Sequence, residues 1–168
     1  MNSTELRNLQ TPLKEKYRAN PETAIITLQA EGKIADGITC KVEGWRTSIE
    51  AGLHPATGGD GSFACSGDML LQALVACAGV TLSAVATAIG VEIQNGIVKA
   101  EGELDFRGTL GMSKDVPVGF KSIRLSFTLE TGATKEQMES LTKLTERYCV
   151  VYQTLTKGVN IETQFQFS

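Results

Sequence analysis

The sequence predicts an α+β fold with antiparallel strand pairing, because its strand-like segments come in runs instead of alternating singly with helices. Three such segments lie between residues 24 and 51, two more between residues 97 and 130, and one at residues 158–167. The most apolar stretch of the chain, residues 69–89, separates the first run from the second and predicts a long central helix. We therefore expect antiparallel sheets around a buried helix.

The N-terminal residues 3–18 are rich in Glu, Lys, Leu and Arg, which predicts a short amphipathic helix, broken near Pro12 and ended by Asn20-Pro21. We treat residues 1–21 as a helical extension and residues 22–168 as a single domain. Residues 24–30, 37–43 and 45–51 predict a meander whose first turn lies at Gly32 and at residues 35–37. A Gly-rich loop, residues 52–67, then leads to the central helix.

The central helix should begin at Ser66 or Gly67 and end at Gly90 or at residues 95–96. A helix that is apolar on nearly every face is buried on all sides, and one domain of this size cannot easily surround it, which indicates a partner subunit. We reject a membrane span, because polar residues interrupt the stretch and neither end has flanking Lys or Arg. Those polar residues are Gln72, Thr81, Ser83 and Thr87.

Downstream, residues 97–109 and 121–130 alternate between apolar and polar side chains, which predicts two strands. Residues 134–147 begin with Thr-Lys-Glu and predict a helix. The alternating residues 158–167 predict a final strand.

Composition limits the function classes. A chain of 168 residues with 42% apolar and 21% charged residues is typical of one soluble domain. A net charge of -3 with scattered Lys and Arg argues against nucleic-acid binding. The N-terminus shows no apolar signal segment, so we expect a cytoplasmic protein, whose four cysteines are reduced thiols. None of them forms a Cys-x-x-Cys motif.

Two cysteines are the main candidates for chemistry. Cys77 lies near the middle of the apolar helix, and Cys149 lies downstream at the end of a helical pattern. For either one alone, inert packing is the default interpretation. Cys77 lies beyond the first helical turn, so its activation should come from a cation on another element. Lys33, Arg46 and Arg147 are the candidates, and the sequence does not choose among them.

The remaining candidates are weaker. Cys65 lies at the start of the central helix, where its pKa could be lowered, but twelve helical residues place it roughly 18 Å from Cys77. Cys40 is expected in the core. His54 is the only histidine, which excludes a multi-histidine metal site within one chain. Shaping the turn before Pro55 is its expected role. A Cys-His hydrolase using His54 is the least supported hypothesis.

The segment Pro55–Gly79 resembles the signature of the OsmC/Ohr family, the osmotically inducible and organic hydroperoxide resistance proteins. Residues 147–151, Arg-Tyr-Cys-Val-Val, look like that family's later helix. The resemblance implies that Cys77 is the peroxidatic thiol, that Cys149 is the resolving thiol, and that two chains form an intertwined dimer with the sites at the interface. Gly67 stands where the family's hydroperoxidases have an acid, and Asp68 occupies the neighbouring place.

Together these features predict a thiol-dependent peroxidase for organic hydroperoxides. A Cys77 sulfenic acid would condense with Cys149 to a disulfide, which an external dithiol would reopen. The resemblance suggests a lipoyl-type dithiol or a small thiol, and no metal, flavin or nicotinamide is required. Leu70 and Leu74 could shape a pocket for an alkyl chain. The alternative is a non-catalytic dimer on the same scaffold that binds a small apolar or electrophilic ligand.

Overall fold

The computed structural model describes residues 1–35, 38–43 and 48–167. The helices are α1 (Ser3–Ala19), η1 (Pro21–Ala24), η2 (Pro55–Thr57), α2 (Ser66–Ile89), α3 (Phe106–Thr109), α4 (Lys135–Tyr148) and α5 (Val150–Lys157). The strands are β1 (Glu31–Ala35), β2 (Thr39–Glu43), β3 (Ser48–Gly52), β4 (Asn95–Glu103) and β5 (Ser122–Glu130). Every strand pair is antiparallel, so the predicted α+β class is confirmed.

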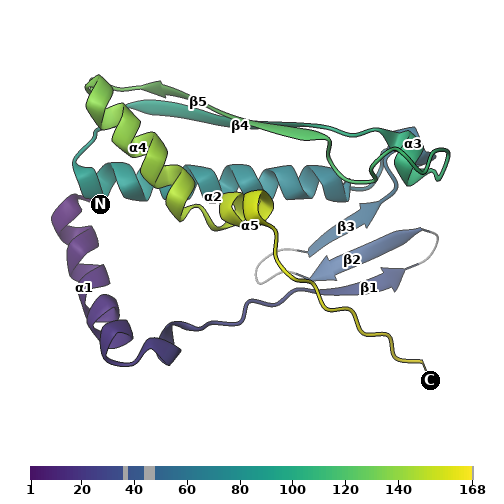
Figure 1. Cartoon of the computed structure of the whole chain (residues 1–168), viewed down its shortest axis with the longest axis horizontal. Coiled ribbons are helices and arrows are strands. Elements are labelled where there is room, and N and C mark those ends of the chain that lie inside the picture. The colour runs from purple at the N-terminus through teal and green to yellow at the C-terminus, as the bar shows by residue number, and fades with distance from the viewer. Residues whose placement is uncertain (36–37, 44–47, 168) are drawn as a thin grey trace.

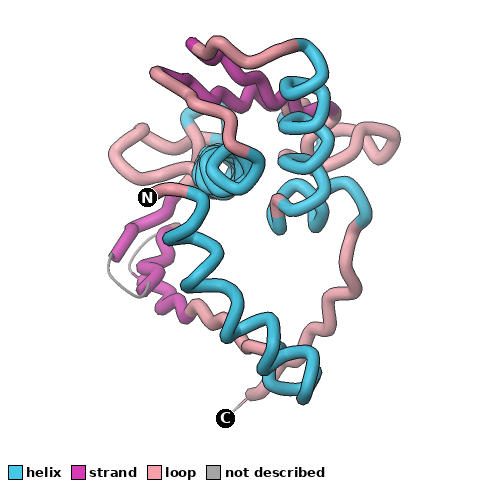
Figure 2. Tube along the Cα trace, turned by 90° about the vertical axis from the view of Figure 1, so that its left-hand side faces the viewer, coloured by secondary structure: helices cyan, strands magenta, loops and turns pink. Residues whose placement is uncertain are grey.

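Helix α2 is the central rod of the molecule, and the β4–β5 hairpin runs along one side of it (Figure 1). The three-stranded sheet β1-β2-β3 lies on the opposite side of α2, as the end-on view shows (Figure 2). Helices α4 and α5 pack beside α2 and close one flank. Within one chain, α2 therefore packs mainly against β4, α4 and α5.

Helix α1 is continuous, so the predicted break near Pro12 is wrong. Both of its ends carry stabilising groups: Asn2 and Glu5 form a capping box, and Lys16 and Arg18 lie in the last turn. The helix ends at Asn20, as predicted.

Two strands of the meander lie where they are predicted, since β2 and β3 fall at 37–43 and 45–51, and only the first strand is shifted. Strand β1 covers residues that the sequence assigned to the first turn, and it pairs with β2 through Ile34 opposite Cys40. The predicted strands at 24–30 and 158–167 are absent from the sheets of the described residues. An extended segment counts as a strand only when a neighbour accepts and donates its backbone hydrogen bonds, and a single chain offers neither segment such a neighbour.

Helix α2 begins at Ser66 and ends at Gly90, whose φ of 74° lies in the left-handed region that favours glycine. Its length and apolar composition match those of a membrane span, and only 28% of its most apolar window is buried inside the chain. One face packs into the core with Leu141, which is fully buried. The opposite face is open, since Val80 is 73% exposed. A single chain therefore does not bury α2 on all sides, as expected for a domain of this size.

The C-terminal half contains two departures from regular structure. Strand β4 ends at Glu103, earlier than predicted, because the Asp105 side chain accepts a hydrogen bond from the Arg107 N–H and caps the short helix α3. Cys149 is both the C-cap of α4 and the N-cap of α5, and its backbone is extended (φ −73°, ψ 109°). The chain therefore bends at the second candidate cysteine.

Candidate active site

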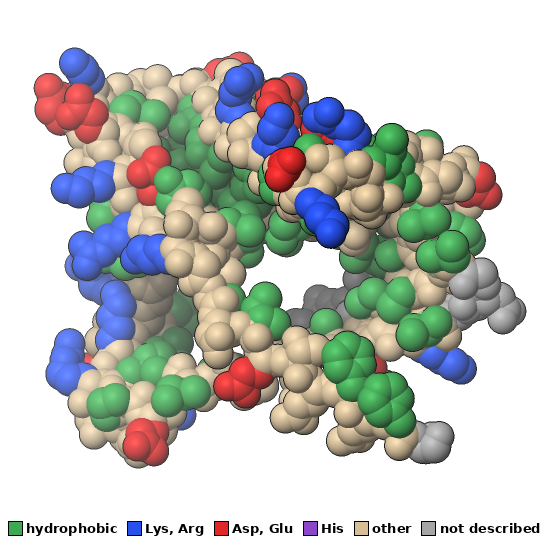
Figure 3. All heavy atoms as spheres, turned by 45° about the vertical axis from the view of Figure 1, so that its right-hand side comes forward, with side chains coloured by type: hydrophobic (Ala, Val, Ile, Leu, Met, Phe, Trp, Pro, Cys, Tyr) green, Lys and Arg blue, Asp and Glu red, His purple; other side chains and the backbone are tan. Residues whose placement is uncertain are grey.

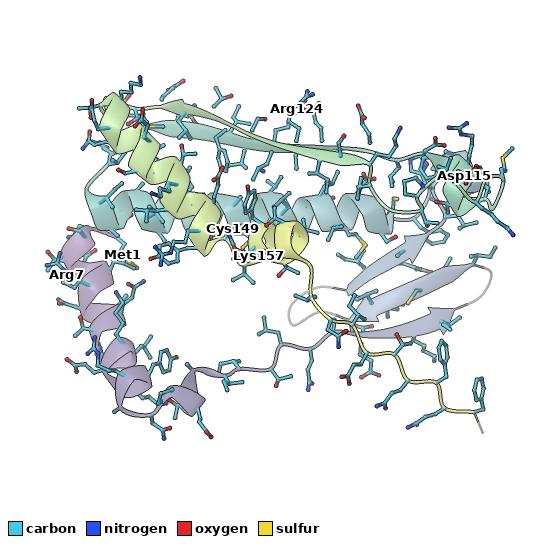
Figure 4. All side chains as sticks on the ribbon, viewed as in Figure 1. Met1, Arg7, Asp115, Arg124, Cys149 and Lys157 are labelled. Atoms are coloured by element: carbon cyan, nitrogen blue, oxygen red, sulfur yellow. The ribbon has the colours of Figure 1, made fainter. Side chains whose placement is uncertain are left out.

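The structure brings Cys77 and Cys149 together. Cys77 lies midway along α2 and is half-buried, whereas Cys149 is 1% exposed in the bend between α4 and α5. Figure 4 shows Cys149 in this bend, where α4 and α5 cross α2. The two thiols lie close enough for each to shift the pKa of the other. This contact joins the two motifs that the sequence singled out separately.

The N-terminus of α5 is directed at this pair of sulfurs. The backbone N–H groups of Val150 and Val151 donate hydrogen bonds to the Cys77 sulfur, and those of Val151 and Tyr152 donate to the Cys149 sulfur. No side chain caps α5, so the thiols occupy the place of a capping group. Because the first N–H groups of a helix carry partial positive charge, they favour a negatively charged sulfur.

These contacts shift the pKa values of the two thiols in opposite directions. Burial raises the pKa of Cys77, but hydrogen bonds from Val151, Cys149, Val150 and the Thr81 hydroxyl outweigh it, and the net pKa is lowered. Burial also raises the pKa of Cys149, and the adjacent Cys77 sulfur raises it further, so that its N–H contacts do not compensate. Cys77 therefore ionises first, with the Cys149 thiol as its donor.

The sequence predicts that a cation on another element activates Cys77. The structure supplies the N-terminus of a second helix instead, together with Thr81 one turn along α2. Among the groups that act on Cys77 in the described part of the chain there is no Lys or Arg. The signal was present in the sequence: Cys149 immediately precedes a new helix.

The other predicted site residues that the structure describes are not among the groups that act on Cys77. Lys33 is exposed on β1, opposite Lys41 of β2. Arg46 lies outside the described residues. Arg147 is placed over the ring of its neighbour Tyr148, with the guanidinium carbon 5.4 Å from the ring centroid. Asp68 is exposed in the first turn of α2, nine residues and about 14 Å of helix before Cys77.

Asp68 lies instead in a second cavity of 580 Å³, together with His54 and Cys65. His54 shapes its turn as expected, since its Nδ1 accepts the Ala56 N–H at 3.0 Å, and its ring stacks on Phe106 with centroids 4.9 Å apart. It forms no pair with Cys77, which argues against the Cys-His hydrolase hypothesis. Within the described ranges no cluster of His, Cys, Asp or Glu could hold a metal ion.

Cys40, expected in the core, is only half-buried on β2. The small sheet that carries it has little packed against it in one chain, because most of its side chains are exposed.

A larger groove of 960 Å³ borders the cysteine pair on the side of β5. Leu74 lines this groove, as expected for an apolar pocket, whereas Leu70 does not. Cys149 is among the lining residues and Cys77 is not. Thr145, one turn before Cys149, also lines it, and its buried hydroxyl has no hydrogen-bond partner among the described residues.

Solved structures of other proteins share the fold of this chain. An OsmC-like protein of Mycoplasma pneumoniae superposes with a TM-score of 0.66 at 16% identity, covering 80% of this chain and 89% of that one. An organic hydroperoxide resistance protein of Elizabethkingia anophelis superposes with a TM-score of 0.63 at 17% identity, covering 80% of this chain and 90% of that one. The organic hydroperoxide resistance protein OhrB of Bacillus subtilis superposes with a TM-score of 0.53 at 16% identity, covering 79% of this chain and 92% of that one. At such identities the likeness shows the fold.

No curated protein matches the chain. The family model described as OsmC-like protein matches residues 59–164, a range that includes both cysteines and the bend between α4 and α5. Since the matched range is more than half of the sequence, the chain belongs to the OsmC-like protein family.

Proposed function

We propose that this protein is a thiol-dependent peroxidase that reduces organic hydroperoxides through Cys77 and Cys149. The observation that carries the proposal is the pair of thiols at the N-terminus of α5, one with a lowered and one with a raised pKa. Family membership supports it, as do fold neighbours named organic hydroperoxide resistance proteins. A cytoplasmic location, where free thiols stay reduced, belongs to the same proposal.

In the first step the Cys77 thiolate attacks the terminal oxygen of the hydroperoxide. The O–O bond breaks, Cys77 becomes a sulfenic acid, and the alkoxide leaves and takes up a proton as the alcohol. The N–H groups of Val150 and Val151 keep the attacking sulfur ionised and oriented. The residues around Cys77 therefore contribute to this step by supplying an ionised and oriented thiolate as the nucleophile.

In the second step the Cys149 sulfur attacks the Cys77 sulfenic sulfur, and the oxygen leaves as water. The existing contact between the two thiols means that the bond can form without a large movement of α4 or α5. A dithiol then reduces the disulfide by exchange and is itself oxidised to a disulfide, which completes the cycle. A lipoyl-type dithiol or a small thiol would serve.

We also propose that two copies form an intertwined dimer. The unpaired segment at 24–30 exposes apolar side chains, with Leu28 89% exposed, and the tail exposes Phe167 at 93%. In the tail, Phe165 and Phe167 share a face, with ring centroids 6.4 Å apart, as alternate residues of a strand do. A second copy could supply partner strands for both segments and cover the open face of α2.

The second candidate function is a non-catalytic dimer that binds a small apolar or electrophilic ligand. The 960 Å³ groove favours it, because its walls come mainly from apolar side chains of α2, β5 and α4. In this case both cysteines would be structural. Ligand binding would then survive the Cys77→Ser substitution, and the protein would show no turnover of hydroperoxide.

One experiment separates the two functions. The fully reduced protein is treated with one equivalent of cumene hydroperoxide, and the cysteine pairs are mapped by mass spectrometry. A fast, stoichiometric disulfide between Cys77 and Cys149, lost in Cys77→Ser with unchanged folding, supports the peroxidase. Slow oxidation scattered over Cys40 and Cys65 as well would leave ligand binding as the better account.

A further inference from the structure

Thr81 is one of the polar residues that interrupt the apolar helix α2, and it lies four residues after Cys77. Residues at this spacing share one face of a helix. Side chains of a helix lean toward its N-terminus, so the Thr81 side chain leans toward Cys77. Both residues are half-buried, and neither side chain is sealed from solvent. A hydroxyl therefore lies beside the thiol at a place that a small molecule can reach.

The Thr81 hydroxyl is bonded differently from the two hydroxyls that follow it on α2. The Ser83 hydroxyl donates to the Gly79 carbonyl at 2.9 Å, and the Thr87 hydroxyl donates to the Ser83 carbonyl at 2.8 Å. This is the ordinary pattern for Ser and Thr inside a helix. Among the described residues no backbone carbonyl accepts the Thr81 hydroxyl, which donates to the Cys77 sulfur instead. The hydroxyl is therefore directed at the nucleophile and is not held by the helix backbone.

The donors around the Cys77 sulfur are of two kinds. The N–H groups of Val150 and Val151 are parts of the α5 backbone, so their direction is fixed. The Thr81 hydroxyl turns freely about its C–O bond. When the thiolate attacks a hydroperoxide, negative charge moves from the sulfur to the departing oxygen, and only a donor that turns can follow the charge.

The surroundings of the pair make such a donor important. Leu74 and Ala78, which flank Cys77 on α2, are buried. Figure 3 shows apolar side chains gathered in the hollow beneath the long hairpin. Among the groups that act on Cys77 in the described part of the chain, no Lys or Arg could neutralise a departing alkoxide. An oxyanion that forms in apolar surroundings is costly unless a hydrogen-bond donor is already in place.

We propose that Thr81 is a catalytic residue, whose hydroxyl first holds the Cys77 thiolate and then turns to the departing alkoxide oxygen as the O–O bond breaks. This inference rests on the proposed function. The sulfur electron pair forms the S–O bond, and both electrons of the O–O bond remain on the alkoxide oxygen. Thr81 donates a hydrogen bond to that oxygen and keeps its own proton. The alkoxide then takes a proton from water, which leaves hydroxide, and departs as the alcohol.

The deciding experiment compares three reagents on Cys77 in a Cys40→Ser, Cys65→Ser background. The reaction with tert-butyl hydroperoxide expels an alkoxide, whereas peracetic acid expels acetate and iodoacetamide expels iodide, which are stable anions without a donor. In the near-isosteric variant Thr81→Val, the rate with tert-butyl hydroperoxide should fall about tenfold relative to the other two, because one hydrogen bond to a charged oxygen is lost. Thr81→Ser, which keeps the hydroxyl, should restore the ratio.

Equal slowing with all three reagents, or no slowing with any, overturns the inference and leaves the peroxidase proposal intact. A parent protein whose Cys77 is alkylated by iodoacetamide but not oxidised by tert-butyl hydroperoxide overturns the peroxidase proposal itself. Thr87→Val is the matched control, because the Thr87 hydroxyl on the same helix is bonded to a backbone carbonyl. It should change none of the three rates. Thr81→Ala gives the same comparison if the Val side chain disturbs the packing of α2.

A series of cumene hydroperoxides with different para substituents gives a second measurement, since the departing alcohols then differ in acidity and little in size. In the parent protein the oxidation rate of Cys77 should depend weakly on the acidity of the alcohol. In Thr81→Val the dependence should be steeper, because the departing oxygen then carries its negative charge without a donor. Parallel dependences in the two proteins would show that the Thr81 hydroxyl does not contact the departing oxygen, and the inference would fail.

Discussion

The backbone N–H of Val151 donates a hydrogen bond to the sulfur of Cys77, so the N-terminus of α5 lies against a thiol on α2. This contact defines the chemistry of the pair, because it makes ionisation of Cys77 easier without the help of a Lys or Arg among the described residues. It also links activity to the position of a short helix.

The first prediction concerns the order in which the thiols react. Cys77 should be alkylated by iodoacetamide at a pH below that expected from the ordinary thiol pKa of 9.0. Cys149 should need a higher pH than an ordinary thiol, because its pKa is raised. Mass mapping of each cysteine after short exposures across the alkaline range measures both profiles. If Cys149 reacts first, the assignment of nucleophile and partner is reversed.

The same shift predicts a pH dependence of stability. The pKa of Cys77 is lowered in the folded state, so its contribution to folding is present above the unfolded pKa and is lost as pH falls through the folded value. The difference in unfolding free energy between the protein and Cys77→Ser should therefore grow as pH rises from neutral. Urea unfolding at several pH values measures it, and a constant difference would contradict the lowered pKa.

The second prediction isolates a single backbone donor. Val150 is the first residue of α5, a position where Pro is tolerated, and Cys149 before it already has the extended backbone that a following Pro requires. Val150→Pro removes one N–H from Cys77 and leaves the helix intact. The alkylation rate of Cys77 at neutral pH should fall about tenfold, as expected for losing a hydrogen bond to a charged group.

Val150→Ala is the matched control, because it removes an exposed side chain and keeps the N–H group. Its Cys77 should react at the rate of the unmodified protein. Equal rates in the Pro and Ala variants would show that the Val150 N–H does not stabilise the thiolate. Circular dichroism of both variants checks that α5 is retained.

The third prediction tests the core that positions Cys149. Leu141 is fully buried between α4 and α2, two turns before Cys149. Leu141→Ala should lower the free energy of unfolding by about 3 kcal/mol, because it leaves a cavity. Leu13→Ala on the exposed side of α1 is the control and should change stability by about 0.5 kcal/mol or less. Urea denaturation distinguishes the two, and similar losses would place Leu141 outside the core.

Local patterns predicted most of the helices and the long hairpin. The apolar run of α2, the Thr134 capping box of α4 and the alternation of β5 each act over neighbouring residues, so their signals are legible in the sequence. The first strand of the meander was misplaced because strand pairing depends on a partner. The segment at 24–30 alternates as well as β1 does, and only the available neighbour distinguishes them.

The sequence predicted the two cysteines of the candidate site and not the geometry around them. The motifs around Cys77 and Cys149 identified the two thiols, and their contact could be inferred only through resemblance to a family. The N–H donors of Val150 and Val151 carry no side-chain signature, since any residue except Pro supplies one. Thr145 was overlooked because a buried hydroxyl without a partner is visible only when its surroundings are known.

The fourth prediction tests the proposed exchange of strands between two copies. Phe165 and Phe167 are 79% and 93% exposed in one chain, and burial of two such rings against a second copy would contribute several kcal/mol, roughly 2 for each ring. Replacing both with Asp should weaken the dimer by about a thousandfold and shift the sedimenting species toward monomer at micromolar concentration. Met112→Asp, at a site 71% exposed in the loop after α3, is the control. A dimer that survives the double replacement would show that the tail does not pair across the interface, and a parent protein that sediments as a monomer would remove the dimer proposal altogether.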